Sequence, residues 1–426
     1  MQINDIHSIF LKCSSLVIDT RKITHKSIFL AIKGDRFDAN TFANEALNLG
    51  ASYVIIDNPS FFIDHRTILV DDSLKTLQEV ALYHRKFLNL PIVALTGSNG
   101  KTTTKELINV VLNKKYKTKA TFGNLNNHIG VPLTLLSFTE ETQIGIVEMG
   151  ANHQKEIEFL CNLTLPDYGY ITNFGKAHLE GFGGVEGVII GKSEMFEHIF
   201  DHNKTAFVNL DDEIQVKKSV GLNKITFGIN NLDANLNIKK VVANPFVEVT
   251  YDNVTIKSAL IGLYNSNNIN AAILIGKYFE IADVDIKAAI ESYIPENNRS
   301  QMMQKNSNKI ILDAYNANPS SMKAAIQNFT QLENPNKILF LGDMFELGDE
   351  SLIEHNAIIS SLFAVNCIAY FIGKYFYANK IAHPNFLFFE NFEEIVPVLK
   401  NGKIENANIL IKGSRGMALE RILEML

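Results

Sequence analysis

The segment from Thr96 to Thr104, Thr-Gly-Ser-Asn-Gly-Lys-Thr-Thr-Thr, has the residue types that hold a nucleoside triphosphate. Its two glycines would let backbone N–H groups and a helix N-terminus surround the phosphate oxygens. Lys101 would reach the β- and γ-phosphates, and the Thr102 hydroxyl would bind Mg²⁺. Leu95 stands where the general P-loop pattern has its first glycine, so the match is incomplete. Against an ordinary surface turn, we predict ATP binding by Thr96, Gly97, Ser98, Asn99, Gly100, Lys101, Thr102 and Thr103.

Three side chains farther along the chain could serve the same chemistry. Glu148 follows the apolar run 144–147, where a buried carboxylate needs a cation or hydrogen bonds to offset its desolvation. Mg²⁺ shared with Thr102 would meet that need, and a capping or salt-bridged glutamate is the alternative. His178 lies in a glycine-flanked loop, where a neutral ring nitrogen could bind a metal or the ring could be a surface group. Lys192, taken alone, resembles a solvated lysine on a helix.

A second polar segment, Asp313-Ala-Tyr-Asn316-Ala-Asn318-Pro319, follows an apolar run near the C-terminus. Its carboxylate and amides could hold ribose hydroxyls or substrate amides. An Asx-turn that leads into a helix begun by Pro319 explains the same residues equally well.

The elements that would position these residues alternate between strand and helix. The run 92–95 is typical of a buried strand and precedes a helix predicted over 105–112, and further strands are predicted at 144–147 and 168–171. Continuous apolar strands separated by helices indicate a parallel sheet covered on both faces. In such sheets the chemistry lies just past the carboxyl ends of the strands.

The alternation divides the chain into three parts. Residues 1–89 contain strand-like runs at 15–18, 27–32 and 53–56 and a helical stretch at 41–49 that Gly50 would end. From residue 296 four new strand-like runs are each followed by a polar or glycine-containing loop. We therefore predict an α/β protein with three domains: a small α/β substrate domain (1–89), a central P-loop-type ATPase domain with a mostly parallel sheet (90–295) and a C-terminal Rossmann-like domain (296–426).

Composition limits the function classes. A net charge of −6 argues against broad binding of nucleic acid. No apolar stretch is long enough to span a bilayer, and the segment Met1–Asp5 lacks the features of a signal peptide. Three cysteines far apart in the sequence do not suggest a disulfide framework. We expect a cytoplasmic protein that does not insert into membranes.

Several motifs together resemble those of the Mur ligases, ATP-dependent enzymes that form amide bonds in peptidoglycan precursors. The resemblance covers nearly the whole chain. It includes Asp19–Lys22 and Ala31–Asp38, then Thr96–Thr104, Gly123–Pro132, Glu148–Ala151 and Ala177–Glu180, and finally Asp313–Pro319, Leu341–Gly348 and Lys412–Gly416. Thr20, Tyr264 and Asn298 stand where serine, histidine and glycine are usual in the family.

The resemblance implies a ligase that joins D-alanyl-D-alanine to UDP-N-acetylmuramoyl-tripeptide through an acyl phosphate, with ATP and two Mg²⁺ ions, acting as a monomer. It implies that Lys101, Glu148, His178 and Lys192 are catalytic. Lys192 would be carbamylated and would help to hold metal with Thr102, Glu148 and His178. Asn268, Arg299 and Asp313 would contact the nucleotide. The substrates would be bound by Thr20, Arg21, Lys33, Asp38, Asn126, Asn127, Asn316, Asn318, Lys412, Ser414 and Arg415.

Two other interpretations stay open. A sister Mur ligase that adds a single amino acid, or a ligase like folylpolyglutamate synthetase, would share the ATP site, although the string Asn316–Pro319 argues against both. A non-catalytic ATP-binding switch or a P-loop motor would leave the first domain and the pair His178 and Lys192 without a purpose.

Overall fold

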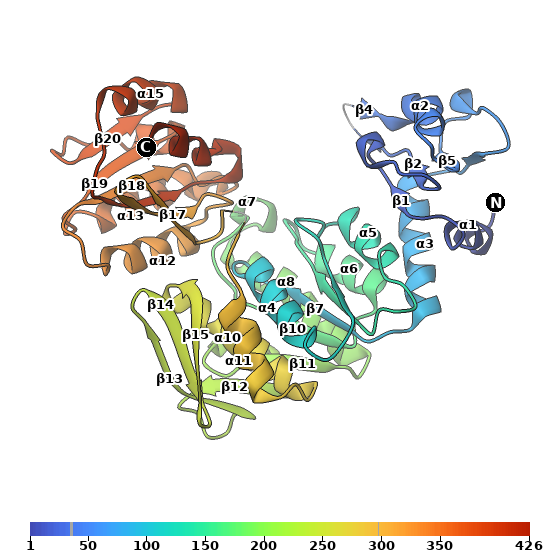
Figure 1. Cartoon of the computed structure of the whole chain (residues 1–426), viewed down its shortest axis with the longest axis horizontal. Helices are drawn as coiled ribbons and strands as arrows, with labels where there is room; N and C mark the ends of the chain where they lie inside the picture. The colour runs from blue at the N-terminus through green and yellow to red at the C-terminus, as the bar shows by residue number, and fades with distance from the viewer. Residues whose placement is uncertain (35–36, 297) are drawn as a thin grey trace.

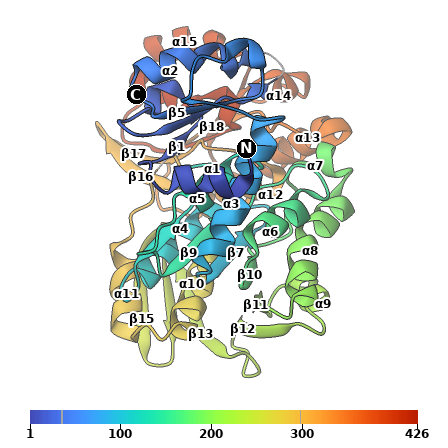
Figure 2. The ribbon, with the colours of Figure 1, turned by 90° about the vertical axis from the view of Figure 1, so that its right-hand side faces the viewer.

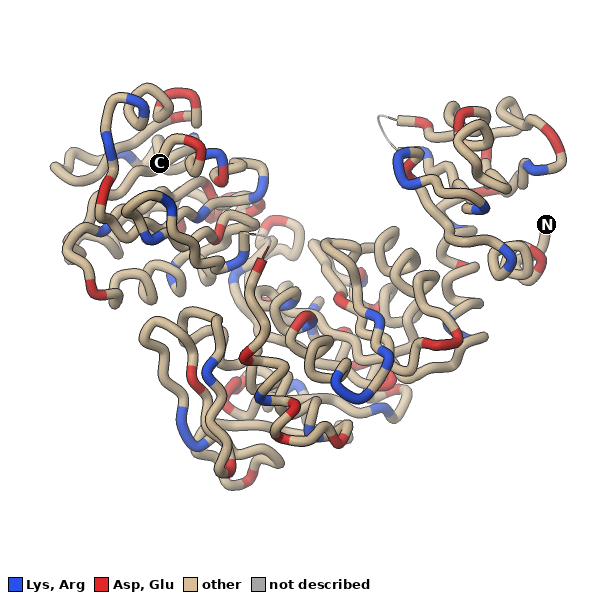
Figure 3. Tube along the Cα trace, in the orientation of Figure 1, with Lys and Arg blue, Asp and Glu red and all other residues tan. Residues whose placement is uncertain are grey.

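The computed structural model describes residues 1–34, 37–296 and 298–426. It has three lobes, each built around its own sheet, which confirms the prediction of a three-domain α/β protein (Figure 1). Within these described residues no helix is long and apolar enough to cross a membrane. Lysine and arginine alternate with aspartate and glutamate along the trace of every lobe (Figure 3).

The N-terminal lobe is a four-stranded parallel sheet in the order β1-β2-β5-β6. A short antiparallel pair, β3 and β4, carries Lys33 and Asp38, and Asp35 and Arg36 between them lie outside the described residues. Helix α3 (Ser73–Leu88) leaves this lobe and packs against both α1 (Ile3–Phe10) and α5 (Gly130–Leu136) of the central lobe (Figure 2). The elements are α1 (Ile3–Phe10), β1 (Leu16–Val17), β2 (Ile28–Leu30), β3 (Lys33–Gly34), β4 (Phe37–Asp38), α2 (Ala43–Asn48), β5 (Tyr53–Ile56), β6 (Thr67–Leu69) and α3 (Ser73–Leu88).

The central lobe contains a nine-stranded sheet in the order β15-β14-β13-β12-β11-β10-β7-β9-β8. The strands from β8 to β13 are parallel, and β13, β14 and β15 form an antiparallel extension. Its strands are β7 (Ile92–Thr96), β8 (Thr118–Ala120), β9 (Ile144–Glu148), β10 (Tyr168–Ile171), β11 (Thr205–Asn209), β12 (Asn223–Ile229), β13 (Leu236–Ala243), β14 (Phe246–Tyr251) and β15 (Val254–Ile261). Its helices are α4 (Lys101–Leu112), α5 (Gly130–Leu136), α6 (Glu156–Thr164), α7 (Leu179–Phe182), α8 (Val185–Asp201), α9 (Glu213–Lys218), α10 (Ser266–Tyr278) and α11 (Asp283–Ser292).

The C-terminal lobe has a six-stranded sheet in the order β16-β17-β21-β18-β19-β20, parallel except for the pair β16 and β17. Its strands are β16 (Gln301–Lys305), β17 (Asn308–Asp313), β18 (Lys337–Gly342), β19 (Ile368–Ile372), β20 (Phe386–Phe389) and β21 (Asn408–Lys412). Its helices are α12 (Pro319–Thr330), α13 (Ser351–Ser361), α14 (Lys374–Ala378) and α15 (Phe392–Asn401).

Apolar strands explain why the sheets are buried. All five residues of β7 are buried, and so are those of its neighbour β9. Strands that are apolar on both faces require helices on both sides of the sheet. The loops that follow such strands are therefore anchored by a rigid core, which is what a precise site needs.

Candidate active site

Three adjacent strands bring the predicted residues together. β7 lies between β9 and β10, with Leu95 opposite Glu148 and Thr96 opposite Ile171. The glycine loop, Glu148 and the segment after Ile171 therefore leave the sheet at the same edge, as the sequence predicted.

The glycine loop depends on two glycines in the left-handed region, Gly97 with φ +136° and Gly100 with φ +80°. A Cβ on Gly97 would lie 2.0 Å from Thr172 Oγ1, and one on Gly100 would lie 2.6 Å from Asn268 Oδ1. Only glycine fits these close approaches. Helix α4 begins at Lys101, directly after Gly100, so the predicted start at Lys105 was wrong by four residues.

Asn99 at the tip of this loop is held from two lobes. Thr172 Oγ1 donates to its carbonyl oxygen at 2.6 Å, and Asn173 Oδ1 accepts from its backbone N–H at 3.1 Å. From the C-terminal lobe, Asn318 Nδ2 donates to Asn99 Oδ1 at 2.7 Å. Asn318 also caps α12 through Ser321, with Pro319 in the first helical turn. The capping interpretation of this segment is therefore correct, and the same side chain also reaches the nucleotide loop.

Lys101 folds back over its own loop. Its Nζ donates to the carbonyl oxygens of Gly97 at 2.6 Å and Ser98 at 3.2 Å. Burial lowers the pKa of Lys101 to about 8, although Glu148 raises it and Arg299 lowers it further. The ammonium therefore lies at the loop in a poorly solvated place, where phosphate oxygens would replace the two carbonyls as partners.

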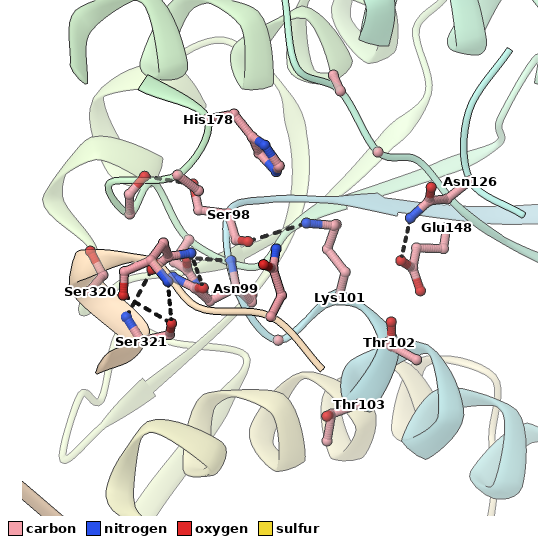
Figure 4. A pocket seen from close by; sticks show the side chains of 18 of the residues that line it. Ser98, Asn99, Lys101, Thr102, Thr103, Asn126, Glu148, His178, Ser320 and Ser321 are labelled. Carbon is pink, nitrogen blue, oxygen red and sulfur yellow. Dashed lines mark hydrogen bonds between the residues drawn. The ribbon is translucent and has the colours of Figure 1, made fainter. Parts of the chain in front are cut away.

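Glu148 is a buried carboxylate with one unsatisfied oxygen. The side chain is only 1% exposed, its Oε1 accepts from Asn126 Nδ2 at 2.8 Å, and its Oε2 has no partner. Thr102 lines the same pocket from the first turn of α4 (Figure 4). A carboxylate and a hydroxyl beside a phosphate loop are the ligands that Mg²⁺ prefers, so these residues fit that ion.

His178 lies in the loop between β10 and α7 in a left-handed conformation, with φ +55°. Its Nδ1 bonds Glu346 of the C-terminal lobe. That bond lowers the pKa of the Glu346 carboxyl, which stays ionised. No three His, Cys, Asp or Glu side chains among the described residues form a metal cluster on their own, so metal at His178 would need other ligands such as phosphate oxygens.

Lys192 is not a solvated lysine. It is 1% exposed within α8, and its Nζ donates to the carbonyl oxygen of Ala151 at 3.1 Å and lies 4.9 Å from the ring centroid of Phe182. Burial first, and the charge of Lys101 second, lower the pKa of Lys192 well below its usual range, whereas Glu156 and Glu194 act in the opposite direction. The charged form of Lys192 is therefore disfavoured, and the neutral form of a lysine amine is a nucleophile.

Residues of the C-terminal lobe close the other side of the pocket. Lys412 Nζ contacts Asp313 Oδ2 at 2.5 Å, and Ser300 N–H donates to Asp313 Oδ1 at 2.9 Å. The Arg299 guanidinium stacks 3.5 Å from the ring centroid of Tyr315. Asn298 has φ +58°, a conformation that asparagine adopts more readily than most residues, which explains how it replaces the usual glycine.

Most of the predicted residues of the central and C-terminal lobes line one cavity of about 1140 Å³. Tyr264 also lines it. Those lining it are Ser98, Asn99, Gly100, Lys101, Thr102, Thr103, Asn126, Asn127, Glu148, His178, Asn268, Arg299, Asp313, Asn316, Asn318 and Lys412.

Other predicted residues lie outside its lining. Thr96 ends β7 and donates its hydroxyl to the carbonyl oxygen of Met149, and Gly97 packs closely against Thr172. Lys192 contacts the lining residue Ala151. Ser414 accepts from Phe345 N–H at 2.9 Å and Arg415 pairs with Glu420 at 2.8 Å. The four predicted residues of the N-terminal lobe do not line the cavity: Thr20, Arg21, Lys33 and Asp38. In that lobe Arg21 pairs with Asp19, and the Asp38 carboxylate accepts from Asn40.

Sequence reasoning assigned no role to Glu346, Tyr315 or Lys176. Glu346 and Tyr315 lie within strings already noted for the family resemblance, and that was the only available signal. Lys176 forms an ion pair of 2.5 Å with Glu354 of the C-terminal lobe. Its partner is far away in the sequence, so no local pattern reveals the contact.

A glycine loop that opens a helix beside a buried carboxylate, after an interior strand of a mostly parallel sheet, is typical of a P-loop nucleotide-binding protein. The Mur ligase middle domain model matches residues 95–276, and the model of the Mur ligase, glutamate ligase domain matches residues 298–415. The chain is 34% identical to the UDP-N-acetylmuramoyl-tripeptide–D-alanyl-D-alanine ligase of Bacillus subtilis (strain 168), over 95% of this chain and 91% of that one. It is also 34% identical to the ligase of the same name from Escherichia coli (strain K12), covering 97% and 93%.

Solved structures agree with these matches. A crystal structure of MurF from Acinetobacter baumannii has a TM-score of 0.86 at 29% identity, covering 96% of this chain and 92% of that one. MurF ligase from Thermotoga maritima in complex with ADP has a TM-score of 0.84 at 26% identity, covering 98% and 97%. The chain belongs to the Mur ligase family.

Proposed function

We propose that this protein joins D-alanyl-D-alanine to UDP-N-acetylmuramoyl-tripeptide at the expense of ATP, in peptidoglycan precursor synthesis. The observation that carries the proposal is the 34% identity, over 95% of the chain, to a ligase named for that reaction. The pocket shared by the central and C-terminal lobes supports it, because a ligase must hold ATP and two substrates around one reacting carbon.

In this proposal the glycine loop from Thr96 to Thr103 binds the phosphates. Lys101 neutralises the β- and γ-phosphates, Asn268 contacts adenine, and Arg299 and Asp313 hold the nucleotide from the C-terminal lobe. The two bonds from Lys101 to loop carbonyls support this role, since they keep the ammonium where phosphate would arrive. Tyr264 supplies an aromatic face beside Asn268.

The orphaned Oε2 of Glu148 supports a first Mg²⁺ between Glu148 and Thr102. His178 would hold a second ion together with carbamylated Lys192. The lowered pKa of Lys192 supports carbamylation, because a neutral amine can attack the carbon of CO₂ and lose one proton to form an anionic carbamate. When bound, Mg²⁺ would screen the repulsion between an anionic carboxylate and an anionic γ-phosphate.

The carboxylate oxygen of the tripeptide attacks the γ-phosphorus, the bond to the β,γ-bridging oxygen breaks, and ADP leaves. The neutral amine of D-alanyl-D-alanine then attacks the acyl carbon of this acyl phosphate. Inorganic phosphate leaves, the nitrogen loses a proton, and an amide remains. Lys101 stays beside the transferring group throughout, and the seated C-terminal lobe excludes water that would hydrolyse the acyl phosphate.

We propose that each lobe binds a different part of the substrates. We assign the UDP part to Thr20, Arg21, Lys33 and Asp38, the muramoyl-peptide part to Asn126 and Asn127, and D-alanyl-D-alanine to Asn316, Asn318, Lys412, Ser414 and Arg415. We also propose domain limits at 1–89, 90–295 and 296–426, and a monomer that acts in the cytoplasm. The limits fall between α3 and β7 and between α11 and β16.

The test is mass spectrometry of the product from ATP, Mg²⁺, UDP-N-acetylmuramoyl-tripeptide and D-alanyl-D-alanine, with single amino acids as competing acceptors. We expect the tripeptide mass to increase by one D-alanyl-D-alanine less one water, with one ADP formed per amide. Lys101→Ala should abolish phosphate release. Preference for a single amino acid would identify a sister ligase, and tight ATP binding without ADP formation would refute a ligase.

A further inference from the structure

The segment that follows β10 and includes the start of α7 is one of the parts of the central lobe that contact the C-terminal lobe. Lys176 N–H donates to Ser320 Oγ at 3.0 Å, and the Lys176 ammonium pairs with Glu354 at 2.5 Å. Glu180 N–H donates to the carbonyl oxygen of Glu346 at 3.2 Å. His178 lies within this docked segment, so its surroundings depend on both lobes.

The contact between His178 and Glu346 sets the chemistry of the imidazole. An ionised carboxylate can only accept, so Nδ1 of His178 must carry the hydrogen and donate it to Glu346. In a neutral imidazole the lone pair then lies on Nε2. The ring of His178 lines the same pocket as Lys101 and Glu148 (Figure 4). Among the described residues, Nε2 has no hydrogen-bond partner.

The backbone on both sides of this contact is unusual. His178 has φ +55° and Glu346 has φ +62°, and neither residue is glycine. Such conformations cost free energy and tend to occur where a site needs a particular side-chain direction. An exposed ion pair contributes little to stability, so stability alone gives no reason to maintain two strained residues around a half-exposed glutamate.

We propose that Glu346 is a positioning residue that holds His178 as a metal ligand, so that the second metal site is complete only when the C-terminal lobe is seated. A carboxylate that accepts from the distal nitrogen of a ligating histidine fixes the tautomer and the ring orientation, and its loss typically weakens metal binding 10–100-fold. The inference rests on the proposed function for the metal. It adds that the lobe binding the acceptor also contributes to the ion site.

Direct titration with Mn²⁺ tests the proposal. Free Mn²⁺ is followed by electron paramagnetic resonance at fixed ADP for the full-length protein and its variants. We expect Glu346→Ala to lower the affinity for the second bound ion by about 10–100-fold. The affinity for the first ion, at Thr102 and Glu148, should stay unchanged. Glu346→Gln keeps an oxygen that accepts from Nδ1–H and should restore most of the affinity. Unchanged Mn²⁺ binding in Glu346→Ala would overturn the proposal.

Glu354→Ala is the matched control, because it breaks an ion pair at the same interface without touching His178. If Glu354→Ala weakens Mn²⁺ binding as much as Glu346→Ala does, Glu346 acts only by holding the lobes together, and the proposal fails. In the double variant His178→Ala and Glu346→Ala, the affinity for the second Mn²⁺ ion should be little lower than in the single variant His178→Ala. If the two substitutions lower the affinity independently, so that their effects on the binding free energy add in full, the proposal is also refuted. Since no peptide substrate is present, the outcome is independent of which acceptor the enzyme uses.

Discussion

Replacing Glu148 by glutamine should make the metal-free protein more stable and should remove the stabilisation that Mg²⁺ gives to the wild-type protein. The buried Oε2 of Glu148 has no partner, and an unsatisfied buried polar group costs about 1–3 kcal/mol, more if it is charged. Glutamine keeps an oxygen for Asn126 and leaves a neutral NH₂ group instead of a charged oxygen at the unpartnered position. We expect a gain of about 1–3 kcal/mol in EDTA, which is an increase in melting temperature of about 2–10 °C for a lobe of this size.

Magnesium should offset most or all of this difference. In the wild-type protein, Mg²⁺ at 100 times its Kd in the presence of ADP should add about 2.7 kcal/mol, because Oε2 then gains a ligand bond. Glu148→Gln should gain almost nothing from the ion. Differential scanning calorimetry with ADP, in EDTA and in Mg²⁺, measures both effects.

The control is Glu140→Gln, an exposed carboxylate in the same lobe that should shift neither transition. Two results would refute the reasoning. The first is a Glu148→Gln protein less stable than wild type in EDTA, which would mean that the carboxylate is already satisfied. The second is a full Mg²⁺ response in the variant, which would place the ion elsewhere.

Three other predictions follow from the same structure. Gly97→Ala should lower stability by about 3 kcal/mol or more and abolish nucleotide binding in calorimetry, because its Cβ would meet Thr172 Oγ1 at 2.0 Å. Gly123→Ala, at φ +57° with open space around it, should cost only about 1 kcal/mol, and an equal cost for both would contradict the steric argument. Lys192→Met should melt higher than wild type and release no phosphate, whereas Lys192→Ala should regain partial turnover with bicarbonate or a short-chain acid, and a fully active variant would exclude Lys192 from the site. Burial lowers the pKa of His198 to about 4, so the unfolded chain binds the proton more readily and stability falls as pH drops below 6.5. In urea unfolding, the free energy of unfolding should fall between pH 7.5 and pH 5.5 by about 1 kcal/mol less for His198→Gln than for wild type. An equal fall in both proteins would mean that burial does not lower the pKa of His198.

The parts of the site predicted from sequence are those that local pattern determines. The glycine loop, Glu148 and the segment after β10 follow apolar strands, and parallel strands place their carboxyl ends at one edge. The start of α4 was missed because Lys101 to Thr104 contains three β-branched threonines, which have modest helix propensity. Tertiary packing around Gly100 and Thr104 overrides that preference.

Contacts between residues far apart in the sequence could not be predicted from local patterns. The bond between His178 and Glu346 joins residues 168 positions apart, and the pair Lys176 and Glu354 spans 178. The burial of Lys192 was hidden as well, because it depends on α8 packing against Phe182 and Ala151 rather than on any periodicity. The antiparallel extension β13–β15 was not anticipated, since the strand–helix alternation before it suggested that the parallel pattern would continue.

The position of Lys101 affects which anions the enzyme can select. The Lys101 ammonium donates to the carbonyl oxygens of Gly97 and Ser98, so a positive charge lies on the loop and these bonds stabilise its conformation without a ligand. A small anion such as inorganic phosphate would have to replace both carbonyls as partners of that ammonium while offering few other contacts to the loop. A triphosphate offers more oxygens to Lys101 and to the backbone N–H groups of the loop. The bonds of Lys101 to its own loop thus compete with the ligand, and this competition favours larger polyphosphates over small anions.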